Sequence, residues 1–103
     1  MPILSFQSRW VEPILTGRKT QTLRRTLGGL DRAETVPAYC DHGRPPFAHL
    51  RICSIEPVHR SDLTDLDAAR EGMSDLGELG SALDRLYPGT EALVRIRFEL
   101  TEV

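Results

Sequence analysis

The chain has 103 residues, of which 40% are hydrophobic and 27% are charged, and its formal net charge is −2. This length allows one small hydrophobic core and therefore one domain, and the composition is ordinary for a soluble globular protein. The weakly negative charge argues against a protein that coats nucleic acid without sequence preference. Because the sequence has neither an apolar run long enough for a membrane span nor a signal-peptide pattern, we expect a cytoplasmic location and no membrane partner.

The hydrophobic pattern predicts a mostly β domain with three short helices. The predicted elements, in chain order, are a strand over residues 3–6, a helix over 9–16, a strand over 20–26, a loop over 27–31, strands over 33–40 and 47–58 joined by a turn over 41–46, helices over 61–72 and 74–86, and a strand over 91–101. In the first helix, Ser8 is expected to be the N-cap and Gly17 the residue that ends the helix.

The C-terminal elements have clearer signals. Thr64 is suited to cap the second helix and Gly72 to end it. The third helix has leucines on one face: Leu76, Leu79, Leu83 and Leu86. In the last strand, apolar residues alternate with charged ones, which is typical of a half-buried strand. We therefore expect a small curved or closed sheet.

The two cysteines, Cys40 and Cys53, form neither a CxxC motif nor a disulfide framework. We interpret them as free thiols buried in strands. The histidines His42, His49 and His59 are scattered and lack the spacing of zinc ligands. The sequence therefore predicts no metal site and no cofactor.

Basic residues are unevenly distributed. Twelve of the thirteen are arginine, and Lys19 is the single lysine. Residues 9–25 include five basic residues and one acid, whereas residues 62–91 include eight acids and two arginines. The N-terminal third is thus expected to form a local positive site suited to a phosphate, a carboxylate or a developing oxyanion, but not an extended nucleic-acid track.

Lys19 lies beside two hydroxyls, those of Thr20 and Thr22. Unlike arginine, a lysine can lose its proton when burial and nearby cations, here Arg18 and Arg24, lower its pKa, and it can then deprotonate a threonine. Thr20, Thr22 and Arg24 share one face if they form a strand, which places Lys19 on the other face unless it lies in the turn after the first helix. The alternative is that the threonines are ordinary strand residues and Lys19 is one surface exception in an arginine-rich chain.

Three further residues are candidates. Glu71 precedes Gly72 at a predicted helix end, where the helix dipole disfavours a carboxylate, and such conflicts often mark functional sites. The alternative is a solvated surface glutamate. The hydroxyl of Tyr87 could face a pocket while its ring packs, and Trp10 is interpreted as a core residue rather than a stacking platform.

Several segments resemble a known family. Residues 4–6 (Leu-Ser-Phe) and 14–24 (Ile-Leu-Thr-Gly-Arg-Lys-Thr-Gln-Thr-Leu-Arg) resemble the signature of the ASCH domain, a PUA-like β-barrel superfamily linked to RNA metabolism. Many ASCH proteins have an acid at the position of Thr22. The threonine, together with residues 68–73 and 86–89, resembles the narrower group of bacterial N(4)-acetylcytidine amidohydrolases.

The resemblance covers residues 4–26 and 63–101 and is poor over residues 27–46. It implies a single ASCH domain over residues 1–103, of the α+β class and mostly β, with a small PUA-like barrel and about three short helices. Because loops such as residues 27–46 shape substrate pockets, the acyl group that the protein accepts is not determined.

The resemblance further implies an amidohydrolase that cleaves the N(4)-acyl group of acylated cytidine or cytosine with Lys19, Thr22 and Glu71 as catalytic residues. Our hypothesis is that Lys19 deprotonates Thr22, which attacks the acyl carbon, while Glu71 transfers protons to the leaving amine or from the deacylating water. The alternative is a water activated by Lys19 and Glu71, with Thr22 only holding the substrate. The predicted substrate-binding residues are Arg18, Thr20, Arg24 and Tyr87, and Arg24 or backbone amides near Gly17 could stabilise the oxyanion.

Two other functions stay open at this point. The same basic cluster could bind RNA in an ASCH module without catalysis, or cleave RNA as an ASCH-type ribonuclease. The negative net charge and compact basic cluster favour a small nucleoside over a long strand, and the combination of Lys, Thr and Glu favours catalysis. The sequence determines neither whether the target is a free nucleoside or RNA, nor the oligomeric state.

Overall fold

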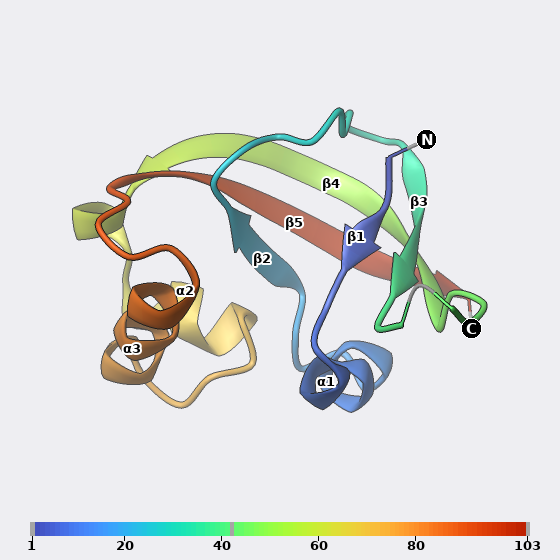
Figure 1. Cartoon of the computed structure of the whole chain (residues 1–103), viewed down its shortest axis with the longest axis horizontal. Coiled ribbons are helices and arrows are strands. Elements are labelled where there is room, and N and C mark those ends of the chain that lie inside the picture. The colour runs from blue at the N-terminus through green and yellow to red at the C-terminus, as the bar shows by residue number, and fades with distance from the viewer. Residues whose placement is uncertain (1, 42, 103) are drawn as a thin grey trace.

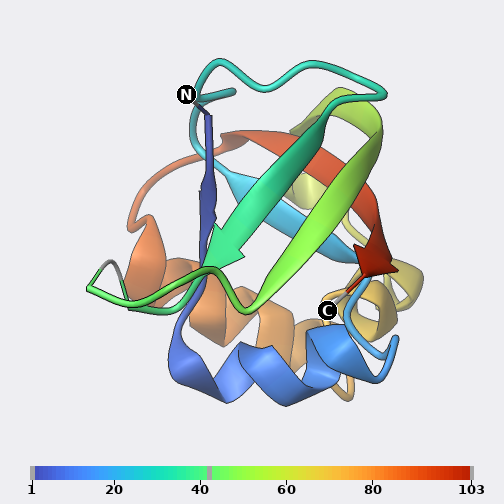
Figure 2. The ribbon, with the colours of Figure 1, turned by 90° about the vertical axis from the view of Figure 1, so that its right-hand side faces the viewer.

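The computed structural model describes residues 2–41 and 43–102, and in this part of the chain one five-stranded sheet forms the framework (Figure 1). Its strands are β1 (Leu4–Ser5), β2 (Gln21–Arg24), β3 (Thr35–Tyr39), β4 (Ala48–His59) and β5 (Ala92–Glu102). The order in the sheet is β1-β3-β4-β5-β2, in which β1 and β3 are parallel and the other pairs are antiparallel. The sheet curls into a half-barrel (Figure 2), which confirms the predicted fold class.

The helices gather on one side of this sheet (Figures 1 and 2). They are α1 (Val11–Leu15), α2 (Asp65–Arg70) and α3 (Leu76–Leu86), with the short 3-10 helices η1 (Ser8–Trp10) and η2 (Arg60–Asp62). Within the described residues, no helix is long and apolar enough to cross a membrane.

Of the four residues predicted at helix ends, Thr64, Gly17 and Gly72 are confirmed, Gly72 following the C-cap of α2 with a φ of +83°, and Ser8 is wrong. Thr64 is the N-cap of α2, where its backbone N–H donates to Asp67 Oδ2 at 3.0 Å. Gly17 follows the C-cap of α1 with a φ of +81°, a conformation that glycine adopts at little cost. Ser8 is not a cap, because the chain enters a 3-10 turn at Ser8 itself and Gln7 precedes that turn.

The core has two parts. One cluster fills the curl of the sheet and consists of Leu4, Phe6, Ile14, Leu30, Val36, Ala38, Ala48, Leu50, Ile52, Ile96 and Phe98. The other lies between the sheet and the C-terminal helices and consists of Leu23, Leu63, Ala68, Met73, Leu79, Ala82, Leu83 and Leu93. The alternation predicted for β5 therefore holds at Ile96 and Phe98, but Leu93 is buried on the opposite face because α2 and α3 cover it.

The predicted burial of the cysteines is wrong. Cys40 and Cys53 are both free thiols, as expected, but both are exposed. Cys40 follows the last residue of β3. Cys53 lies on the outer face of β4, where His49, Arg51 and Cys53 are exposed and alternate with the buried residues Leu50 and Ile52.

Candidate active site

A cavity of about 390 Å³ lies where β2 and the end of α2 meet α3 and the segment that follows β1. Its volume is within the usual range for small-molecule sites, roughly 300–1,000 Å³. Of the predicted site residues, those that line it are Lys19, Thr22, Arg24, Glu71 and Tyr87. The structure thus brings the three predicted catalytic residues together from segments that are about fifty residues apart in sequence, as the 52-residue separation of Lys19 and Glu71 shows.

The turn after α1 places Lys19. The backbone N–H groups of Arg18 and Lys19 both donate to Pro13 O, at 2.9 and 3.0 Å, so the chain reverses before β2 begins at Gln21. Lys19 therefore lies in the turn rather than in the strand. Its side chain is thus not forced onto the face of the strand opposite Thr22 and Arg24. Its side chain is only 3% exposed.

Glu71 is held at the C-cap of α2, directly against Lys19. The Nζ atom of Lys19 donates to Glu71 Oε1 at 3.3 Å and to Glu71 O at 3.1 Å. Gly72, with a φ of +83°, makes this approach possible, because a Cβ atom there would lie 3.4 Å from Lys19 Cβ and 3.3 Å from Trp10 Cζ3. The Glu-Gly pair at the helix end thus brings a buried carboxyl to the only lysine of the chain.

Burial moves both groups of this pair toward their neutral forms. Desolvation raises the pKa of the Glu71 carboxyl, and the charge of Lys19 opposes this effect. Desolvation also lowers the pKa of the Lys19 amine, with Glu71 opposing it and the nearby Arg24 and Arg9 lowering it further. Burial therefore increases the fraction of Lys19 that is a free amine at any given pH, which is the form a general base needs.

One carboxyl oxygen of Glu71 is available for chemistry. Oε2 is buried and has no hydrogen-bond partner among residues 2–41 and 43–102, whereas Oε1 accepts from Lys19. A buried acceptor without a partner is costly, and in native structures it often indicates a functional role. An acid that lines a cavity with a free oxygen can exchange a proton with a bound molecule.

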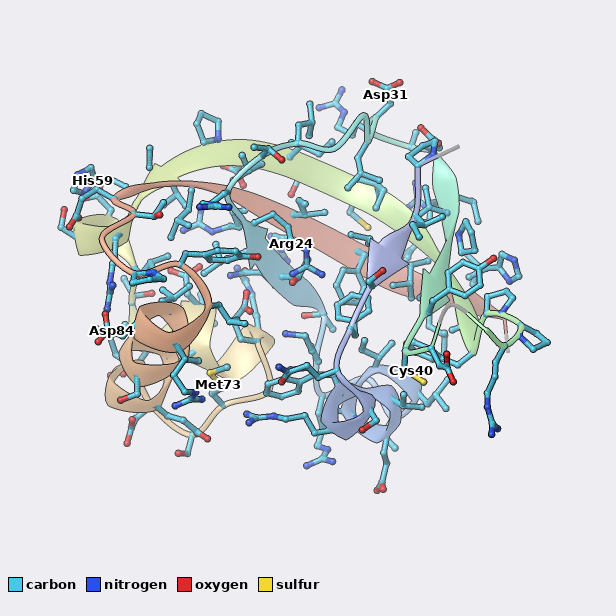
Figure 3. The ribbon with its side chains drawn as sticks, viewed as in Figure 1. Arg24, Asp31, Cys40, His59, Met73 and Asp84 are labelled. Carbon is cyan, nitrogen blue, oxygen red and sulfur yellow. The ribbon has the colours of Figure 1, made fainter. Side chains whose placement is uncertain are left out.

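Thr22 and Arg24 share the inner face of β2, as the sequence pattern predicts for a strand. Thr22 is opposite Ile96 of β5 and is 2% exposed. Its Oγ1 accepts a short hydrogen bond from Arg24 Nη1, and Arg24 Nη2 donates to Ser5 O at 2.8 Å. Figure 3 shows Arg24 in the gap between β2 and β1. A guanidinium on the hydroxyl oxygen stabilises negative charge there, and so favours loss of the Thr22 proton.

The other predicted binding residues separate into two groups. Tyr87 is half-buried at the end of α3 and lines the cavity, with Arg25 Cζ 5.7 Å from its ring centroid. Arg18 is exposed, and Thr20 uses its backbone to join β2 to α2 and β5. Neither Arg18 nor Thr20 lines this cavity, and a role for them in substrate binding stays a prediction.

Sequence reasoning missed the polar network that holds α2 in place. Gln21 Nε2 donates to Asp67 Oδ1 at 3.1 Å, and Arg95 Nε donates to the same oxygen at 2.9 Å. Gln21 and Asp67 are buried, so these bonds tie α2, and with it Glu71, to β2 and β5. A glutamine inside a strand pattern was the available signal for this network.

Two further arginines line the cavity: Arg9, which belongs to the basic cluster predicted over residues 9–25, and Arg85, which the sequence did not single out. Trp10 lines it as well and packs against both core clusters, so it is more than the core residue that was predicted. Within residues 2–41 and 43–102, no three His, Cys, Asp or Glu side chains are grouped so that they could hold a metal ion. His42 lies outside the described residues.

Comparison with known proteins finds relatives over nearly the whole chain, although no protein-family model matches it. The N(4)-acetylcytidine amidohydrolase of Serratia proteamaculans is 33% identical over 96 residues, which are 92% of this chain and 93% of that protein. The protein of the same name from Vibrio vulnificus is 34% identical over 98 residues, or 93% of this chain and 92% of the relative.

Solved structures of low sequence identity share the fold. The ASCH domain of Lactobacillus crispatus aligns with a TM-score of 0.78 at 15% identity, covering 96% of this chain and 79% of that one. The ASCH protein of Zymomonas mobilis aligns with a TM-score of 0.72 at 16% identity, covering 97% of this chain and 66% of that one. These alignments agree with the curled half-barrel described above.

Proposed function

The chain belongs to the N(4)-acetylcytidine amidohydrolase family, and we propose that it hydrolyses N(4)-acylated cytidine to cytidine and a carboxylic acid. The observation that most supports this proposal is that the buried Lys19–Glu71 pair and Thr22 line the same cavity. Acyl transfer from an amide requires a nucleophile, a base that activates it and an acid for the leaving amine, and these three side chains meet those requirements.

In the proposed reaction, Thr22 Oγ1 attacks the acyl carbon and Lys19 takes its proton. The amine and the hydroxyl are not directly bonded in the resting site, since Lys19 donates to Glu71 and Thr22 accepts from Arg24. Proton transfer therefore needs a small side-chain movement or a bridging water, which is common in sites without a ligand. The guanidinium of Arg24 stabilises charge as it develops on the reacting oxygens.

Glu71 completes the cycle. Because burial raises its pKa, the carboxyl can hold a proton and donate it to the departing N(4) nitrogen of cytosine. The resulting carboxylate can then accept a proton from the water that hydrolyses the Thr22 ester. As Thr22 Oγ1 leaves the acyl carbon, the Lys19 ammonium returns to it the proton taken in the first step. All three groups then regain their starting states, and water is the only other reactant consumed.

The Glu71→Gln variant tests this assignment. We expect kcat for N(4)-acetylcytidine to fall by about 10²- to 10⁴-fold, because the amide keeps the shape of the side chain but cannot exchange a proton. Initial rates are measured by chromatographic separation of N(4)-acetylcytidine from cytidine. The matched control is Glu12→Gln, an exposed glutamate of α1 that does not line the cavity and should keep wild-type activity. A Glu71→Gln variant with normal kcat would exclude Glu71 as the proton donor.

A second target, RNA that contains the acylated base, is favoured by the arginines around the cavity. Arg9 and Arg85 line it, and Arg25 lies over the Tyr87 ring. Free nucleoside stays our first proposal, because the relatives are named for a nucleoside and the net charge of the chain is −2. A cytoplasmic location and a link to RNA modification stay predictions.

Salt dependence separates the two targets. We expect kcat/KM for the free nucleoside to change less than about twofold between roughly 50 and 200 mM salt, because a neutral substrate releases no counterions. An unmodified RNA oligonucleotide added as competitor should leave turnover unchanged. Strong inhibition by that RNA at low salt, which disappears as salt is added, would instead indicate that RNA is the target.

A further inference from the structure

The only tryptophan of the chain, Trp10, covers the proposed base. It is the last residue of η1, it is half-buried, and its ring lines the cavity. The Nζ atom of Lys19 lies 4.5 Å from the ring centroid, and Arg9 Cζ lies 4.3 Å from the same centroid. Both distances are typical of a cation–π contact.

Gly72, at the end of α2, allows the Trp10 ring and Lys19 to pack closely. A side chain at that position would lie 3.3 Å from Trp10 Cζ3, so the absence of one lets the ring, the lysine and the end of α2 pack together. The position of the ring relative to Lys19 is thus set by packing on several elements, namely η1, the turn before β2 and the end of α2.

We propose that Trp10 is a positioning residue that stabilises the ammonium formed on Lys19 during the reaction. This inference rests on the proposed amidohydrolase function. As the bond between Thr22 Oγ1 and the acyl carbon forms, the O–H bond breaks and the proton moves to Lys19 Nζ. The negative face of the indole attracts the new ammonium but has little attraction for the neutral amine. An interaction that strengthens as charge develops lowers the barrier instead of only tightening binding.

The ring acts together with the charged groups that face Lys19. Glu71 at the end of α2 favours the ammonium, whereas Arg24 on β2, Arg9 on η1 and burial disfavour it. The Trp10 ring adds to the first effect, since it also favours the charged form. Its removal should therefore make Lys19 a weaker base with a lower pKa.

Fluorinated tryptophan tests the proposal with little change of shape. Because Trp10 is the only tryptophan, replacing all tryptophan with mono- or difluorinated analogues alters this position alone. Fluorine withdraws electron density from the ring face and weakens the attraction for a cation. We expect the plateau value of kcat to fall stepwise, by roughly three- to tenfold for the difluorinated protein. The limb of the pH profile on which activity rises as Lys19 loses its proton should move to lower pH.

The control addresses the second cation on the ring. In an Arg9→Met background, the same series should give the same stepwise decrease if Lys19 is the cation that matters. Trp10→Phe should lose less activity than Trp10→Leu, because phenylalanine keeps a weaker π face.

If the fluorinated proteins hydrolyse N(4)-acetylcytidine with unchanged kcat and an unchanged pH profile, the proposal for Trp10 is wrong while the amidohydrolase function stands. If the wild-type protein does not hydrolyse N(4)-acetylcytidine, the proposed amidohydrolase function is wrong, and the proposal for Trp10 is wrong with it.

Discussion

Replacing Lys19 by methionine is expected to lower kcat for N(4)-acetylcytidine by about 10³-fold or more, within the range measured for loss of a general base. The methionine side chain fills the volume of the lysine stem but has no amine to accept the proton of Thr22. The fold should persist, because the Glu71 carboxyl left without its partner can stay protonated, as burial already raises its pKa. Steady-state rates and a thermal melt of the same sample measure both quantities.

Lys19→Arg separates charge from basicity. Arginine keeps a positive charge beside Glu71 but cannot give up its proton in a protein, so we expect it to be as inactive as the methionine variant. The matched control is Arg32→Met, which removes an exposed cation that does not line the cavity and should change kcat less than about twofold. Near-normal activity of Lys19→Arg would mean that lysine acts through its charge and not as a base.

The second large effect is expected at Thr22. Thr22→Val, which has almost the same shape and no hydroxyl, should lower kcat by about 10³-fold if the hydroxyl is the nucleophile. Thr22→Ser keeps a hydroxyl and should stay within about tenfold of the wild type. Rapid-quench kinetics measure the chemical step, and mass spectrometry of the quenched protein can detect an acetyl group on Thr22.

The same variants distinguish the alternative in which Lys19 and Glu71 activate water. In that case Thr22→Val should raise KM and leave kcat nearly unchanged, because the hydroxyl would contribute only to binding. Thr35→Val, at an exposed position on β3, controls for the effect of the substitution on a strand. A Thr22→Val variant with wild-type kcat and no acetylated form would contradict the nucleophile assignment.

Much of the fold could be predicted because its signals are local. The alternation around Ile96 and Phe98, the cap at Thr64 and the turn glycine at Gly17 each determine structure over a few residues. The prediction failed where a distant element decides the outcome. Leu93 is buried because α2 and α3 cover that face of β5. Cys53 is exposed because the outer face of β4 on which it lies is left uncovered, as it is at His49 and Arg51.

The candidate site, like the fold, could be predicted where its signals are local in the sequence. Glu71 was conspicuous because a carboxylate at a helix end is locally unfavourable, and the structure shows it buried against Lys19. The position of Lys19 in a turn depends on Pro13 O, which accepts two backbone N–H groups, and no sequence period encodes that contact. The contacts of Gln21 with Asp67 and of Trp10 with Lys19 depend on how the chain folds, and they became visible only in three dimensions.

The most direct test of the central claim is hydrolysis of N(4)-acetylcytidine by the purified wild-type protein in oxygen-18-enriched water, with both products analysed by mass spectrometry. The amidohydrolase proposal predicts cytidine and acetate in equal amounts, with one heavy oxygen in the acetate. The label is the same for both mechanisms, because a water molecule attacks either the substrate directly or the acetyl ester on Thr22. Absence of cytidine and acetate after prolonged incubation with stoichiometric protein would contradict it.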